Sequence, residues 1–255
     1  MAVVETEKQG NIFIITLNRP EARNAVNGDV AEGIEAAIDT FEADDQLWVG
    51  IIASSGKVFC AGADLKAISS GEGARLSTER GGFAGLVRRE RTKPLIAQVN
   101  GAALAGGCEV VLACDMAVAA EEAIFGVPEV KRSLVPAAGG LFRLPRAVGP
   151  AVGMELMLTG DPIPAQRAHD LGLVNYVTTQ DELQAKTMEL AGRIAVNAPL
   201  AVQQAMQVTK RALTDSDEEL WKASGEAMRF LYGTEDFKEG PRAFIEKRAP
   251  VWKAK

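Results

Sequence analysis

The feature that most constrains this chain is an apolar run at residues 99–120, rich in glycine and alanine but interrupted by carboxylates. Its first carboxylate, Glu109, directly follows residues 106–108 (GGC). A carboxylate in such a run is costly to bury unless it is hydrogen-bonded, neutralised or used in chemistry. A helix that begins near Gly106 presents free N–H groups to an anion or to an oxygen that gains negative charge. The run therefore predicts an acid or base beside backbone donors, as in a catalytic site.

Composition excludes several classes of protein. The 255 residues can form one large domain, or one domain with a smaller appendage. A net charge of −6 and an aromatic content of 5% argue against a nucleic-acid partner. Three cysteines without a CxxC pair predict buried free thiols. We find no apolar signal sequence or membrane-length run, so we expect a cytoplasmic protein without a membrane partner.

Hydrophobic patterning predicts an α/β core over the first part of the chain. Strands are expected at residues 11–17, 48–53, 93–99 and 115–120, and helices after Asn27, after Asp64 and within the central run. A loop is expected at 56–65, and the polar, glycine-rich stretch 69–82 predicts a mobile lid or a disordered loop. Alternation of strand and helix is typical of an α/β fold.

The pattern becomes helical after Val177. Helices are predicted at residues 181–197, 199–213 and 216–232, with a short one at 240–247. We divide the chain at this change of pattern, into a core at 1–195 and a C-terminal helical region at 196–255. The apolar surface of these helices suggests packing onto another subunit, but packing onto the chain's own core explains the pattern equally well.

Common catalytic motifs are absent. Residues 101–107 have the glycine spacing of a phosphate loop but lack its lysine. Residues 71–76 begin like a dinucleotide fingerprint but do not complete it. The only histidine, His169, lies near a predicted helix end, which makes a Ser-His-Asp triad or a zinc site unfavourable. Carboxylates and backbone N–H groups remain, and no metal is expected.

A second carboxylate, Glu129, follows one strand after Glu109, so both side chains can reach one pocket. Simpler interpretations remain open at this point. Glu129 can pair with Lys131 or Arg132 on the surface, and Glu109 can face solvent from a helix. Residues 62–64 can be an ordinary helix start.

Several segments, in order, resemble the crotonase (enoyl-CoA hydratase/isomerase) superfamily over nearly the whole chain. They are residues 18–25 (NRPEARNA), 59–66 (FCAGADLK), 99–101 (VNG), 106–109 (GGCE), 125–129 (FGVPE), 139–144 (GGLFRL) and 243–248 (AFIEKR). The resemblance implies a crotonase-like spiral of ββα units with a C-terminal helical trimerisation region. It also implies a homotrimer or a hexamer built as a dimer of trimers.

The resemblance further implies an enoyl-CoA hydratase, a hydro-lyase that acts on acyl-CoA thioesters. Its oxyanion hole maps onto the N–H groups of Ala63 and Gly106, and its catalytic glutamates onto Glu109 and Glu129. We assign Glu109 as the base on water and Glu129 as the acid that protonates C2, with reversed roles in dehydration. No separate cofactor is expected, because coenzyme A is part of the substrate.

The same resemblance implies further contacts with the substrate or its CoA. They map onto Arg23, Ala61, Asp64, Leu65, Lys66, Pro136 and Ala137, and onto Phe244 and Lys247 from a neighbouring subunit. Ordinary surface charge and core packing are the simpler interpretations of Arg23, Lys66, Phe244 and Lys247. Two residues depart from the family pattern, since Ala137 and Ser133 stand where hydratases commonly have glycine.

Alternative functions remain within and beyond this family. Isomerases often lack one of the two glutamates, so their joint presence favours a hydratase or dehydratase over a double-bond isomerase. Residues 81–86 and 246–253 look similar to the subgroup that dehydrates carnitinyl-CoA. A trimethylammonium group needs aromatic faces or a carboxylate nearby, and the sequence places no such cage. A non-catalytic acyl-CoA binder or assembly subunit is the third hypothesis.

Overall fold

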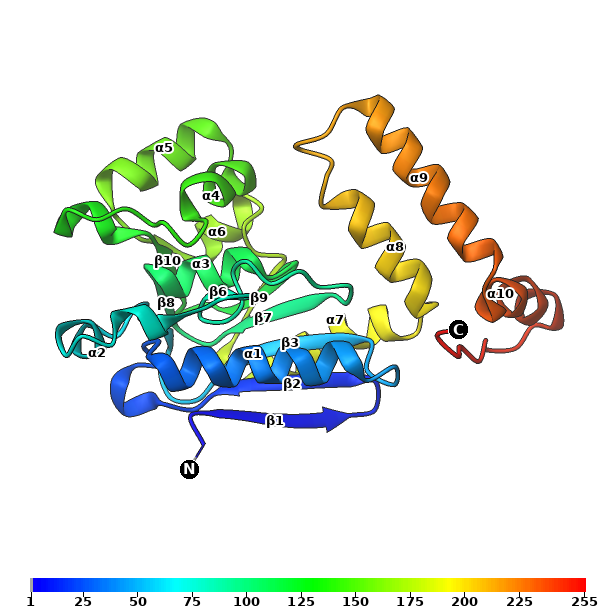
Figure 1. The fold of residues 1–255 in the computed structure, drawn as a ribbon, viewed down its shortest axis with the longest axis horizontal. Helices are drawn as coiled ribbons and strands as arrows, with labels where there is room; N and C mark the ends of the chain where they lie inside the picture. Colours follow the sequence, from blue (N-terminus) through cyan, green and yellow to red (C-terminus); the bar gives the residue numbers. More distant parts are fainter. Residues whose placement is uncertain (1) are drawn as a thin grey trace.

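The computed structural model describes residues 2–255, which form two main sheets covered by helices (Figure 1). The larger sheet has the strand order β1 (Val4–Gln9), β2 (Ile12–Leu17), β3 (Val49–Ser54), β7 (Leu95–Val99), β9 (Met116–Ala120) and β12 (Tyr176–Thr178). The smaller has the order β11 (Ile163–Pro164), β10 (Ile124–Gly126), β8 (Ala102–Leu104) and β4 (Val58–Cys60). Only the pairs β1–β2 and β10–β11 are antiparallel in these two sheets.

Successive turns of the chain repeat one pattern: a strand of the larger sheet, a strand of the smaller sheet, then a helix. The first turn is β3, β4 and α2 (Leu65–Ser69), and the second is β7, β8 and α3 (Gly106–Ala113). The third is β9 and β10, followed by a 3-10 turn at Pro128–Arg132 and by α4 (Gly140–Val148). The expected series of ββα units is confirmed.

The central strands are apolar on both faces because helices cover both sides of the larger sheet. In β2, Phe13 and Ile15 pack into the core beneath α1 (Gly28–Ala43). The alternate residues Ile12 and Ile14 pack into a second core with α7 (Leu183–Ala195). Helices α5 (Pro150–Thr159) and α6 (Ala165–Asp170) contribute to the first core near α4. Burial on both faces explains the continuous hydrophobic runs in the sequence.

Two strands lie where the pattern predicted other structure. Strand β4 falls within the expected loop 56–65, and β8 falls within the central run before its helix. Both are three residues long, so neither is long enough to show a hydrophobic period. The assignment of these short segments is therefore corrected to strand.

Helices α8 (Pro199–Thr209), α9 (Asp217–Tyr232) and α10 (Glu235–Glu246) stand to one side of the sheets (Figure 1). Helix α8 is joined to the core by the hydrogen bond from Gln207 to the carbonyl of Arg91, at 2.9 Å. Helix α10 begins before its predicted start because the Thr234 hydroxyl caps it by accepting the Phe237 N–H. Among residues 2–255, no helix combines the length and apolar character that crossing a bilayer requires.

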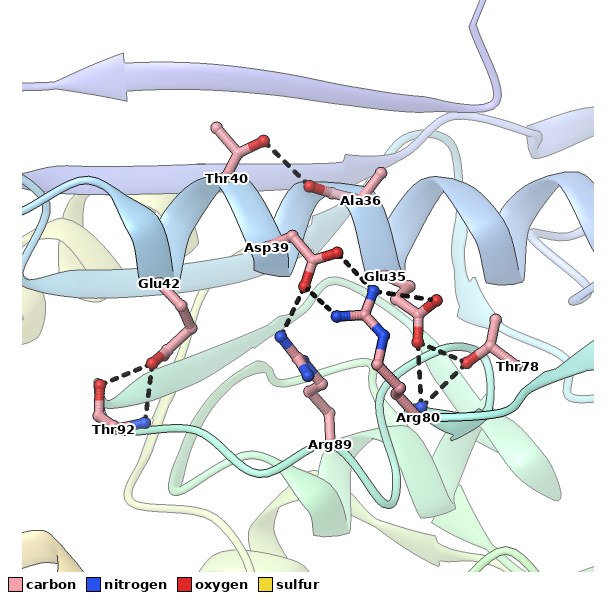
Figure 2. A network of polar contacts seen from close by, with 10 residues as sticks. Glu35, Ala36, Asp39, Thr40, Glu42, Thr78, Arg80, Arg89 and Thr92 are labelled. Carbon is pink, nitrogen blue, oxygen red and sulfur yellow. Dashed lines mark hydrogen bonds and ion pairs between the residues drawn. The ribbon is translucent and has the colours of Figure 1, made fainter.

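The prediction of a disordered loop at 69–82 is wrong. This stretch contains a 3-10 helix at Gly73–Leu76 and the strand β5 (Ser77–Thr78), which pairs with β6 (Gly82–Phe83). Acidic side chains of α1 hold the segment in place (Figure 2). Glu35 accepts hydrogen bonds from Thr78 and from the Gly81 N–H, Asp39 binds Arg80 and Arg89, and Glu42 accepts from Thr92. Polar groups of this stretch bind carboxylates of α1, which is distant in the sequence. The local sequence pattern therefore does not reveal that the stretch is ordered.

Candidate active site

A cleft of about 1620 Å³ lies where α2, α3, α4 and the 3-10 turn at Pro128–Arg132 meet. Most residues singled out from the sequence line it: Arg23, Ala61, Ala63, Asp64, Leu65, Lys66, Gly106, Glu109, Glu129 and Ala137. Pro136 adjoins it, since the residues on either side of it, Val135 and Ala137, both line the cleft. Phe244 and Lys247 lie outside this cleft, on and just after α10.

Glu109 lies in the first turn of α3 with only 3% of its surface exposed. Its Oε1 accepts a 2.8 Å hydrogen bond from the N–H of Gly140, at the start of α4. Burial raises the pKa of Glu109 to about 7, while the Gly140 N–H and the charge of Arg143 oppose the rise. A carboxyl with this pKa can accept or release a proton near neutral pH. The interpretation of Glu109 as a solvent-facing helix residue is wrong.

Glu129 lies on the 3-10 turn Pro128–Arg132, beside the same cleft. Burial raises its pKa, and its Oε2 is buried without a hydrogen-bond partner among the described residues. The surface pairing with Lys131 is absent from this part of the chain, because Lys131 pairs with Asp161 instead. The charge of Glu129 raises the pKa of Glu109, so the two carboxyls are electrostatically coupled. Coupled carboxyls in one site share a proton more easily than they both ionise.

Two backbone N–H groups at this site are free. Those of Ala63 and Gly106 donate none of the hydrogen bonds found among residues 2–255. The two segments approach closely, since a Cβ on Gly62 would lie 3.0 Å from the Gly106 nitrogen. Ala105 adopts φ 52° immediately before α3, a conformation rare for a residue with a side chain. Such strain is found at functional sites, where it directs backbone groups toward a ligand.

The segment at residues 18–25 supports the loop that carries Ala63. Arg19 donates to the carboxylate of Asp64 and to the carbonyl of Ala25. Asn24 is buried and donates to two carbonyls at the ends of the β3–β4 connection. Asp64 also accepts the N–H of Lys66 and so caps α2, as the sequence predicted. Asp64 is therefore tied into the loop, whereas the exposed Arg23 and Lys66 form a cationic rim of the cleft.

Arg143 and Phe83 are site residues that the sequence reasoning did not single out. The half-buried guanidinium of Arg143 donates to the Val87 carbonyl at 2.7 Å, and burial lowers its pKa. The ring of Phe83 lies 2.5 Å from the position that a Cβ on Gly106 would take. Arg143 falls one helical turn after Gly140, a spacing that could have indicated a shared face. No local signal points to Phe83.

All three cysteines are free, as the sequence predicted; Cys60 and Cys108 are also buried, as expected, whereas Cys114 is only partly buried. Burial raises the pKa of Cys60 to about 11 and that of Cys108 to about 12, so both thiols are protonated at neutral pH. Residues 2–255 contain no cluster of three side chains arranged to hold a metal ion.

Comparison with known proteins places this geometry in context. A family model described as enoyl-CoA hydratase/isomerase matches residues 7–255. A carnitinyl-CoA dehydratase from Salmonella typhi is 41% identical over 254 residues, covering 97% of each chain. A probable mitochondrial enoyl-CoA hydratase from Dictyostelium discoideum is 37% identical and covers 97% of this chain and 89% of its own. The crystal structure of an enoyl-CoA hydratase from Mycobacterium tuberculosis H37Rv superposes with a TM-score of 0.96, at 43% identity and over 100% of both chains.

Proposed function

The chain belongs to the enoyl-CoA hydratase/isomerase family and has the crotonase fold, and from this premise we propose that it is an enoyl-CoA hydratase. The reaction is the reversible addition of water to a 2-enoyl-CoA thioester, which gives a 3-hydroxyacyl-CoA. One observation carries the proposal: two coupled carboxyls, the buried Glu109 and the half-buried Glu129, line the same cleft as the free N–H groups of Ala63 and Gly106.

The thioester carbonyl oxygen binds between the N–H groups of Ala63 and Gly106. When water adds at C3, negative charge moves through C2 onto this oxygen as an enolate forms. Fixed donors stabilise that charge more in the transition state than in the ground state. A single donor of this kind lowers the activation free energy by about 2.7–4 kcal/mol.

Proton transfer uses one glutamate in its charged form and the other in its protonated form. Glu109 removes a proton from water as its oxygen bonds to C3, and Glu129 gives its proton to C2. Two features support this assignment: the Gly140 N–H favours the charged form of Glu109, and the partnerless Oε2 of Glu129 is a place for a proton. After the reaction Glu109 holds the proton and Glu129 is charged, so a proton exchange between them restores the starting state. Dehydration follows the reverse path.

The remaining expectations concern CoA and assembly. Arg23 and Lys66 bind the CoA phosphates, while Phe244 and Lys247 contact the CoA of a neighbouring subunit in a homotrimer or hexamer. The exposure of Phe244 (84%) and Ile245 (78%) on α10 supports a subunit contact there. The division into 1–195 and 196–255 is part of this proposal. Three free cysteines support a cytoplasmic, reducing location.

Hydration of crotonyl-CoA tests the proposal and is followed as the loss of conjugated thioester absorbance. Glu109→Gln and Glu129→Gln should each lower kcat by about 10²- to 10⁴-fold, the usual contribution of a general acid or base. Glu122→Gln, at an exposed carboxylate between β9 and β10, is the control and should retain activity.

Two outcomes contradict a hydratase and identify the alternatives. Turnover of a 3-enoyl-CoA without hydration of crotonyl-CoA identifies a double-bond isomerase. Acyl-CoA binding without any turnover, unaffected by both glutamine variants, identifies a non-catalytic binder.

A further inference from the structure

The acyl end of the cleft lies on the side of Gly106 away from the Arg23–Lys66 rim. This placement rests on the proposed function, which puts the thioester carbonyl at Ala63 and Gly106 and CoA at the rim. The acyl chain then extends past Glu109 to a wall formed by the β6 segment and α4. Phe83 and Val87 line the cleft from the β6 side, and Arg143 lines it from α4.

Several of the arginines that line this cleft form no ion pair among residues 2–255. Arg88, Arg132 and Arg143 all line it, and none forms an ion pair with a carboxylate within the described residues. Neighbouring arginines behave differently, since Arg80 and Arg89 both bind Asp39. The cleft therefore contains guanidinium groups that form no ion pair within the described residues.

Arg143 is the most deeply placed of the three. Its Nη2 donates to the Val87 carbonyl at 2.7 Å and its Nη1 to the Ala138 carbonyl at 3.5 Å. Both acceptors are neutral, and burial lowers the pKa of Arg143 because its charge is partly removed from water. The hydrogen bonds of Arg143 go to carbonyls, and the charge of Glu109 acts on it without forming an ion pair. An anion that binds this half-buried guanidinium directly therefore stabilises it further.

Arg88 extends the same cationic wall. Arg88 directly follows Val87, and the Val87 carbonyl accepts a hydrogen bond from the guanidinium of Arg143. The guanidinium of Arg143 therefore contacts the backbone of the segment that carries Arg88. The Arg88 N–H donates to the Gly81 carbonyl at 2.8 Å, and its aliphatic stem packs over Gly82. The stem is thus positioned by the β6 hairpin, and Arg88 is exposed and lines the cleft.

Apart from the ring of Phe83, the groups that would bind a cationic acyl end are occupied. The ring of Phe142 already has the guanidinium groups of Arg143 and Arg146 at 5.5 and 5.3 Å from its centre. Asp64 is paired with Arg19, and Glu21 lies 3.9 Å from the same arginine. Glu109 and Glu129 are the remaining carboxyls of the cleft, and they are committed to proton transfer.

We propose that Arg143 and Arg88 form an anion-binding subsite at the acyl end, so that the preferred substrate is a 2-enoyl-CoA whose acyl chain ends in a carboxylate. A quaternary ammonium at this position meets two guanidinium groups, against the single ring of Phe83. The proposed substrate therefore has a negatively charged acyl end, whereas the name of the carnitinyl-CoA dehydratase relative describes one with a trimethylammonium group.

Two matched pairs of thioesters test the proposal with the full-length enzyme. Glutaconyl-CoA is compared with the neutral isostere in which isopropyl replaces the carboxylate. Crotonobetainyl-CoA is compared with the neutral isostere in which tert-butyl replaces trimethylammonium. The kcat/KM for hydration should be at least about tenfold higher for the carboxylate than for isopropyl, and at least about tenfold lower for trimethylammonium than for tert-butyl.

Variants assign the preference to the two arginines. Arg88→Gln and Arg143→Gln should each reduce the carboxylate-to-isopropyl ratio of kcat/KM toward one. The ratio is the measured quantity because Arg143 also lies near Glu109, so the rate with every substrate can fall. Arg146→Gln, on the same helix but outside the cleft, is the control and should leave the ratio unchanged.

The outcomes separate this inference from the proposed function. If crotonyl-CoA and all four thioesters remain unhydrated, the hydratase proposal fails. If crotonyl-CoA is hydrated but each pair reacts equally, or crotonobetainyl-CoA is preferred, the hydratase stands and the anion subsite is refuted. A ratio that persists in both arginine variants refutes the assignment to Arg88 and Arg143.

Discussion

The N–H of Gly140 donates a 2.8 Å hydrogen bond to Oε1 of Glu109, which joins the start of α4 to the first turn of α3. No side chain fits at Gly140, since a Cβ there would lie 2.8 Å from the Cβ of Pro136 and 3.1 Å from the same carboxylate oxygen. Glycine therefore allows α4 to begin directly against the carboxyl group. The orientation of Glu109 is set by the backbone of a neighbouring helix.

Gly140→Ala should lower kcat for crotonyl-CoA by about 10- to 100-fold with little change in KM, because a displaced carboxylate no longer meets its water. Gly192→Ala is the control, since that position lies within α7 with nothing within 4 Å of the added methyl. This control should retain activity and gain slightly in helix stability. Wild-type kcat in a folded Gly140→Ala enzyme would show that the contact does not orient Glu109.

Burial of Glu109 should make folding stability depend on pH. Its pKa rises from 4.5 to about 7, so the folded state holds the proton more tightly than the unfolded state. The stabilisation is complete below the unfolded pKa and is lost as the pH rises through the folded pKa. Glu109→Gln removes this loss, and at about pH 8 the variant should be more stable to urea than the parent by about 1–3 kcal/mol.

The same measurement at about pH 4.5 is the internal control, because parent and variant should then differ little. An equal difference at both pH values would mean that the carboxyl is not destabilised by burial. Burial of the catalytic carboxyl of Glu109 would then not lower the stability of the folded state.

The local sequence predicted the elements that have their own capping residue and their own hydrophobic periodicity. Asn27 accepts the Val30 N–H at the start of α1, and Asp64 caps α2, both as the sequence indicated. The three-residue strands β4 and β8 were missed because pairing between distant segments creates them. The order of the 69–82 stretch depends on carboxylates of α1, which lie more than 40 positions away in the chain.

The residues of the candidate site also fall into those that the sequence indicated and those that it did not. Glycine and carboxylate spacing indicated Glu109 and the N–H of Gly106, and the family resemblance supplied Ala63 and the use of Glu129. The contact of Phe83 with Gly106 and that of Arg143 with Val87 arise from packing across several elements. No motif or period encodes such contacts, so they required the three-dimensional structure.

The contact of Phe83 with Gly106 predicts a rescue experiment. Gly106→Ala should reduce kcat/KM by about 10²-fold or more, because the methyl group would lie 2.5 Å from the Phe83 ring and displace the N–H donor. Phe83→Ala removes that obstruction, so the double variant should recover at least about tenfold of the loss. A double variant as inactive as Gly106→Ala alone would indicate that the ring is not what excludes a side chain at this position.

The final prediction concerns Asp39 on α1, whose contacts with Arg80 and Arg89 are drawn in Figure 2. Its carboxylate binds Arg80 and Arg89, on either side of the segment that carries Phe83 and Val87. Arg89 also has a buried Nε with no hydrogen-bond partner among residues 2–255. Asp39→Asn should therefore leave a half-buried guanidinium without its counter-ion and destabilise the fold by about 1–2 kcal/mol.

The catalytic groups do not touch Asp39, so the loosened wall should affect binding more than chemistry. For acyl chains that reach this wall, KM should rise by about 3- to 10-fold in Asp39→Asn while kcat changes less than about twofold. Asp29→Asn is the matched control, because Asp29 lies on the same helix and its partner Arg75 is exposed and also bound to Glu32. That variant should change stability by less than about 0.5 kcal/mol and leave KM unchanged. Equal effects of the two variants on KM would mean that the charge of α1, rather than its specific hold on this segment, shapes the acyl end of the cleft.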